Sequence, residues 1–293
     1  MRGRYDNIRD LPYERVEELE RSCEEYWGSE KYSDPKYWLC RAVILEYRRR
    51  LLESLLNKPS ENSLIALAKK LWGFEVFRDV EQAVKRRVLS RMGVADVVKR
   101  IMELLKSGDI ESVKIPGFGP SIKSEILFIY DPERYPIMNK RSIEIMKLLL
   151  NREARTYNEF KELLEPIVKK LEREREIIAK EVLSKVKEGY GIEIKLPKYE
   201  FIDGIIHLLY ESRRGRDVGI TIERFKMFLN GELDSLLLGY VYKLEVPESI
   251  IKKIRRLTAL EEAVSGRRPT ATEVLRKALD LYQKKLVEEL KTV

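Results

Sequence analysis

Residues 113–127, Val-Lys-Ile-Pro-Gly-Phe-Gly-Pro-Ser-Ile-Lys-Ser-Glu-Ile-Leu, constrain the fold of this chain more than any other stretch. Gly117 and Gly119 let the backbone turn tightly, because glycine tolerates positive φ. Pro120 suits the first turn of a helix, where its missing N–H has no partner to lose. The sequence therefore predicts two helices joined by a tight turn. The second helix would begin with bare amides, which form a natural cradle for phosphate.

The residues around the two glycines make this pattern more specific. Ile-Pro precedes the first glycine, Phe118 separates the two, and Ile122, Ile126 and Ile129 follow on one helical face. Residues 109–130 thus resemble the helix-hairpin-helix motif of DNA-repair and other DNA-binding proteins, although Gly-x-Gly alone would also fit an ordinary turn between helices. The resemblance implies that the following residues contact DNA phosphate: Gly117, Phe118, Gly119, Ser121, Lys123 and Lys140.

Composition is compatible with a nucleic-acid partner. The chain has 293 residues, a formal net charge of +8 and 44% hydrophobic residues, which suggests about two domains with real cores. A basic balance favours phosphates or an anionic surface, but it fits a merely soluble basic protein equally well. We find neither a long apolar run nor the apolar core of a signal peptide, and therefore expect a cytoplasmic, nucleoid-associated protein.

Cysteine and histidine counts limit the chemistry. Cys23, Cys40 and His207 are the only residues of their kinds, too few for a zinc site or an iron–sulfur cluster, so we expect no metal or cofactor. The two cysteines are interpreted as buried small hydrophobes rather than a disulfide, and His207 as a core residue. Charged residues reach 36% and glutamine occurs only twice, a composition typical of thermophiles.

Apolar residues at spacings of three and four predict a helical chain up to residue 239. The helices expected before the hairpin are 12–27, 35–57, 60–72, 79–91 and 94–107. Asp34 and Ser60 are the expected caps of two of them. The basic runs Arg48–Arg50 and Lys85–Arg87 are interpreted as solvated helix faces.

The order of parts beyond the hairpin also carries a resemblance. Asp131-Pro132 ends the second hairpin helix, and Asn139 begins another helix. Residues 35–210 are similar to the helix-hairpin-helix superfamily of base-excision DNA glycosylases, with motif evidence confined to 109–150. In that family a lysine nucleophile lies two residues after the second hairpin glycine, and a catalytic aspartate eighteen residues further on. Here these positions hold Ser121 and Asn139.

Both departures remove chemistry that the family needs. Serine has no amine to attack the sugar as a Schiff-base nucleophile. Asparagine cannot supply negative charge to a developing cation on the sugar. An enzyme would require Lys140 or Glu125 to take over, so we favour a catalytically silent relative that grips backbone phosphate without reading sequence.

The last part of the chain has a different pattern. Residues 240–246 alternate and are rich in β-formers, which predicts a strand. A helix beginning at Glu248, a Gly-Arg-Arg-Pro turn and a Thr-x-x-Glu capping box at Thr270 follow. Residues 240–286 resemble the ribbon-helix-helix family, whereas a generic β-α-α tail is the alternative. One strand and two helices cannot bury their apolar faces alone, so the module is expected to form a homodimer.

The resemblance implies a division of contacts within this module. The strand residues expected to face bases in the major groove are Val241, Lys243 and Glu245. The residues expected to hold phosphate are Arg267, Arg268, Thr270 and Thr272.

The expected fold class is mainly α, with three parts. A helical domain, 1–215, would be followed by a linker helix, 216–238, and by the ribbon-helix-helix module, 239–293. The function favoured by these patterns is a non-enzymatic dimeric DNA-binding protein, serving transcriptional regulation, partition or DNA organisation. A base-excision glycosylase or lyase with a DNA-binding tail is the alternative, and a protein-interaction scaffold is a third reading.

Overall fold

The computed structural model describes residues 7–27, 30–233 and 235–237. The chain divides into two compact units, 1–240 and 241–293, and every described residue belongs to the first. All regular elements of this described part are helices, so the expected mainly helical class is confirmed for it. The β-α-α module predicted for 239–293 lies outside the described residues.

The helices follow one another with short connections. Their bounds are η1 Ile8–Asp10, α1 Tyr13–Glu24, α2 Pro35–Asn57, α3 Glu61–Lys70, η2 Trp72–Phe74, α4 Val80–Val84, η3 Lys85–Leu89, α5 Val94–Ser107, α6 Pro120–Tyr130, α7 Lys140–Leu150, α8 Tyr157–Ile178, η4 Ala179–Leu183, α9 Ser184–Tyr190, α10 Lys198–Arg213 and α11 Ile222–Leu229. Of these, η3 and η4 are π-helical turns that continue α4 and α8. Within the described residues, no helix is both long and apolar enough to cross a membrane.

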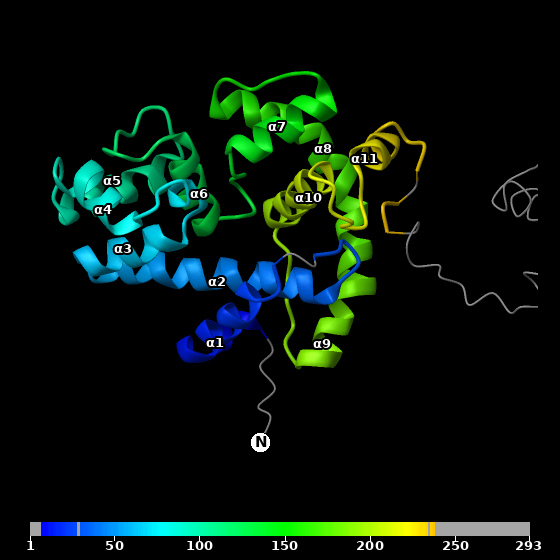
Figure 1. The fold of residues 1–293 in the computed structure, drawn as a ribbon, viewed down its shortest axis with the longest axis horizontal. Coiled ribbons are helices and arrows are strands. Elements are labelled where there is room, and N and C mark those ends of the chain that lie inside the picture. The colour runs from blue at the N-terminus through cyan, green and yellow to red at the C-terminus, as the bar shows by residue number, and fades with distance from the viewer. Residues whose placement is uncertain (1–6, 28–29, 234, 238–293) are drawn as a thin grey trace, which may run out of the picture. The chain divides into compact units, whose positions relative to one another are not determined.

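Helix α2 is the central element of the unit (Figure 1). It packs against α1, α3, α5 and α6 and also against α9 and α10, which come much later in the chain. Figure 1 shows α3–α6 gathered at one end of α2, and α7–α11 toward the other. The hairpin helices and the later helices are thus held on one scaffold.

Helix α11 belongs to this unit rather than to a linker. It packs against α7 and α10, and Phe225 is buried within it. The segment 216–238, expected to be a linker helix, is therefore part of the helical unit as far as it is described. The reason is that its apolar residues complete the core instead of bridging two domains.

Side-chain caps fix where six of the eleven α-helices of the described part begin. Asp34 accepts from the amide of Lys36, and Ser60 forms a capping box with Ser63, as the sequence predicts. The other α-helices capped in this way begin after Asp79, Asn139, Thr156 and Thr221. In contrast, α5 and α6 begin after glycines and have no side-chain cap.

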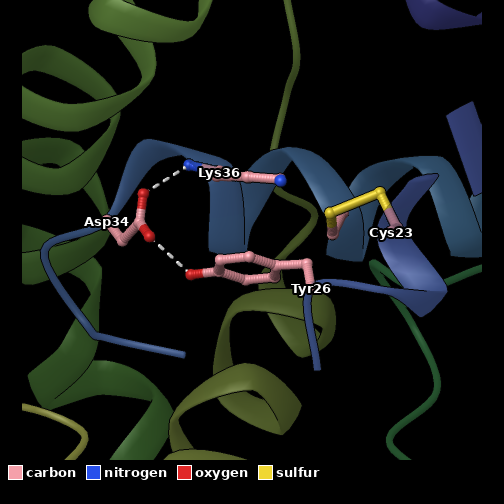
Figure 2. The surroundings of a disulfide bond; sticks show 5 residues. Cys23, Tyr26, Asp34 and Lys36 are labelled. Carbon is pink, nitrogen blue, oxygen red and sulfur yellow. Dashed lines mark hydrogen bonds between the residues drawn. A yellow bond between two sulfur atoms is a disulfide. The ribbon is translucent and has the colours of Figure 1, made fainter. Parts of the chain in front are cut away.

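The two cysteines form a disulfide, so the expectation of free thiols was wrong (Figure 2). Cys23 lies in the last turn of α1 and Cys40 in the second turn of α2, with their Cα atoms 5.3 Å apart. This spacing is within the range that a disulfide spans. Both side chains are buried. Beside them, the Tyr26 hydroxyl donates to Asp34, the cap of α2.

Charged side chains are buried along α2. Arg41 donates to Glu200 at 2.6 Å and to Asp203 at 2.5 Å, and all three are nearly inaccessible. These bonds join α2 to α10. Arg48 is also buried, and its guanidinium lies 4.1 Å from the centre of the Trp72 ring.

The run Arg48–Arg50 is consequently not a solvated face. Arg49 and Arg50 lie partly buried beside Arg48 and pair with Glu46. The run of three arginines was interpreted as a solvated face because charged runs on helices usually face water. Here several other helices cover α2, and the spacing of residues along α2 does not reveal this.

Candidate nucleic-acid interface

A glycine turn and a following helix form where the sequence predicts them. Helix α5 ends at Ser107 and α6 begins at Pro120. Between them, the amide of Phe118 donates to the carbonyl of Ile115 at 3.0 Å. Gly117 adopts φ +77°, the left-handed conformation that glycine tolerates best. The glycine turn thus lies directly before α6, but residues 108–119 form loop and turns, so the expected pair of helices joined by a tight turn is found only in its second half.

The two glycines have different roles. A Cβ on Gly117 would lie 2.9 Å from Val88 Cγ2 and 3.2 Å from the carbonyl oxygen of Arg87, so the turn packs tightly on η3. A Cβ on Gly119 would meet nothing within 4 Å. Phe118 is buried edge-on against Phe74, with ring centres 5.8 Å apart. The turn is thus anchored on one side and open on the other.

The start of α6 meets the requirements of an anion cradle. Gly119 is the N-cap with no side chain to satisfy the first amides, and Pro120 has no N–H. The amides of Ser121 and Ile122 precede the first intrahelical bond, which Lys123 donates to the carbonyl of Gly119. The partial positive charge of a helix N-terminus adds to this preference for anions.

Lys123 occupies a different place from the one expected of a phosphate contact. It is 5% exposed, and its ammonium donates to the carbonyls of Ile110 and Val113 within the turn. Burial lowers the pKa of its amine, and the neighbouring Lys114 lowers it further. Lys123 therefore connects the start of α6 to the backbone of the preceding loop. Lys140 is exposed at the first position of α7, where its ammonium can reach a ligand in solution.

A serine ties α6 to the start of α7. Ser124 accepts from the amide of Met138 at 3.0 Å, and its single hydroxyl proton lies within reach of the carbonyls of Ser121, at 2.9 Å, and Met138, at 3.3 Å. Asn139 caps α7 by accepting from the amide of Ser142 at 2.9 Å. Asn139 accordingly has a capping role, and neither it nor Ser121 brings a charged group to the surface.

Glu125, one of the two residues that an enzyme would need, is locked inside the protein. Its carboxylate accepts from the amides of Trp72 and Gly73 at 2.9 and 3.1 Å and pairs with Arg48 at 3.2 Å. The side chain is 1% exposed. Both oxygens thus hold η2 against α6, a structural role that leaves none of the carboxylate for a substrate.

Burial of Glu125 gives the protein a measurable pH dependence. Burial raises the pKa of its carboxyl from 4.5 to about 7, although Arg48 and the two amides oppose the shift. Between these values the unfolded chain is ionised while the folded protein is protonated. Relative to Glu125→Gln, the wild type should therefore lose unfolding free energy on the order of 3 kcal/mol as pH rises from 4.5 to 7.

Urea denaturation of both proteins across this pH range measures the difference. The two proteins will also differ in stability at every pH, because glutamine disturbs the hydrogen bonds from the backbone amides of Trp72 and Gly73. Only the change of this difference with pH reports the titration of Glu125. A difference that stays constant between pH 4.5 and 7 would show that Glu125 titrates in the folded protein as it does in water.

Sequence reasoning missed a set of basic residues beside the hairpin. A surface hollow of about 650 Å³ is lined by Arg91, Arg100 and Lys114 together with residues of the turn. The adjoining hollow, of about 480 Å³, is lined by Arg91, Lys99 and Arg100. These residues are visible in the sequence before α5, within it and after it, but only folding brings them together beside the turn.

The remaining predicted contacts, Val241, Lys243, Glu245, Arg267, Arg268, Thr270 and Thr272, lie outside the described residues. His207 lies among aromatic side chains as expected, with its ring stacked on Tyr37 and edge-on to Trp27. Burial lowers the pKa of His207 well below its usual value, and nearby arginines lower it further.

Comparisons with protein-family models, with curated proteins and with solved structures gave no match to this chain. The two family resemblances therefore depend on the residues of the sequence alone.

Proposed function

We propose that this protein is a non-enzymatic DNA-binding protein whose hairpin holds a backbone phosphate at the start of α6. A ribbon-helix-helix module in residues 240–286 would pair two chains and read sequence in the major groove. Each dimer would then carry two phosphate grips and one reading ribbon, so avidity would raise the affinity. Such a protein would serve transcriptional regulation, partition or DNA organisation.

One observation carries the hairpin part of this proposal. The first amides of α6 have no side-chain cap, and the position of a Cβ on Gly119 is open space. Both features favour phosphate binding at a helix N-terminus, because they let the ligand approach the backbone N–H groups closely. Six other α-helices of the described part begin instead with a side-chain cap.

Ser121→Asp tests this proposal, because it places a carboxylate where the phosphate would bind. An acidic residue in the first turn suits the helix dipole, so the fold should be kept or slightly stabilised. We expect affinity for duplex DNA to fall on the order of tenfold or more, because like charges at an interface repel strongly. Fluorescence anisotropy at fixed salt measures the affinity, and thermal unfolding checks the fold.

Ser184→Asp is the matched control. Ser184 is exposed at the start of α9, at the other end of the unit (Figure 1), and its substitution changes the net charge equally. It should weaken binding only slightly, through the overall field of the protein. If the two variants bind DNA equally well, the hairpin does not hold phosphate.

A further inference from the structure

The two hollows beside the hairpin form one groove. They share Arg91, Met92 and Arg100, so the wall of one continues into the other. The first hollow reaches Phe118 and Pro120 at the turn. The second ends at Gly93, where α5 begins. We call this continuous surface, from Pro120 to Gly93, the basic groove.

Positive charge dominates its lining. The basic residues along both hollows are Arg91, Lys99, Arg100, Lys114 and Lys123, and the acidic ones are Asp96 and Glu111. Arg91 and Lys99 form no ion pair with any residue that the structure describes. Arg100 pairs with Glu103 at 2.7 Å, and the Lys114 ammonium donates to the carbonyl of Glu111 at 2.8 Å.

The groove floor is apolar and held by the hairpin itself. Ile110, Ile115 and Phe118 are buried where they line it. Lys123 lies beneath the surface with its ammonium on the turn carbonyls, so it adds positive potential without changing the shape. The groove is therefore a preformed cationic channel that opens next to the amides of α6.

We infer that the basic groove binds the phosphodiester backbone of DNA on one side of the phosphate held at the hairpin. This inference rests on the proposed function and extends it, because it assigns a path to the strand. The charge of the groove complements a polyanion, and its length joins the α6 cradle to the start of α5. Arg91 and Lys99 are the residues free to pair with phosphates along this path.

The test is the double variant Arg91→Ala/Lys99→Ala in the full chain. Each lost phosphate contact should make the slope of log K against log salt concentration about 0.9 less steep on duplex DNA. We expect the double variant to lower the slope by nearly two and the affinity by about tenfold or more at moderate salt. The loss should be the same on unrelated sequences, because phosphate contacts do not read bases.

The matched control is Lys169→Ala/Arg173→Ala on α8, which removes the same charge from exposed positions away from the groove. If both double variants change the slope equally while Ser121→Asp still weakens binding, the groove path is wrong and the hairpin grip stands. If neither Ser121→Asp nor the groove variant affects binding, the proposed function of the hairpin fails as well.

Discussion

Replacing Arg41 with methionine should lower the free energy of unfolding by about 3 to 5 kcal/mol. Arg41 pairs with Glu200 and Asp203, and all three side chains are buried between α2 and α10. Methionine has a similar length but no charge, so two carboxylates would remain buried without a cation. Most of the lost stability comes from leaving two buried carboxylates without a cation. The net contribution of the ion pairs themselves is smaller.

Chemical denaturation of the variant measures this effect, and two further proteins identify its cause. Arg100→Met removes an exposed pair with Glu103 and should change stability by less than about 1 kcal/mol. The triple variant Arg41→Met/Glu200→Gln/Asp203→Asn removes all three charges and should recover a large part of the loss. If Arg41→Met is no more harmful than Arg100→Met, the buried network does not hold α2 to α10.

Opening the disulfide between Cys23 and Cys40 should lower the free energy of unfolding by about 3 kcal/mol. The bond closes a loop with a sequence separation of 17 residues and connects α1 to α2. Reduction frees the unfolded chain from this constraint, while the packing around Val16 and Tyr26 remains. The expected result is a lower unfolding midpoint in reducing buffer at an unchanged helix content.

The variant Cys23→Ala/Cys40→Ala separates the bond from the reductant. It should match the reduced wild type and should not respond further to reductant. Mass spectrometry after alkylation of the unfolded protein counts the free thiols before each measurement. A reductant effect of equal size in the cysteine-free variant would show that the disulfide contributes nothing to stability.

Much of the helical fold could be predicted from local sequence. The predicted helix 35–57 coincides with α2, and 94–107 coincides with α5, because apolar spacing, caps and glycines are local signals. The turn before α6 was predictable for the same reason, since Gly117 adopts a positive φ and Pro120 opens the helix that follows. The helix predicted to begin at Asn139 is α7, with Asn139 as its N-cap and Lys140 as its first helical residue.

The failures share a different physical origin. Whether Arg48 faces solvent depends on Glu125 and Trp72, which approach α2 only in the folded chain. The pairing of Cys23 with Cys40 depends on how α1 lies on α2, which spacing does not determine. Lys123 was assigned to phosphate by its closeness in sequence to Gly119, but one further turn of helix directs its ammonium into the hairpin.

The bonds of Arg41 have a consequence for how the chain is made. Arg41 and its partner Asp203 are separated by 162 positions. A ribosome adds roughly 5 to 20 residues per second, so on the order of 10 to 30 seconds pass between the synthesis of the two residues. During that interval α2 carries an arginine whose carboxylate partners do not yet exist. Early chains therefore stay incompletely packed around α2, and truncation before α10 should yield a protein that proteases degrade.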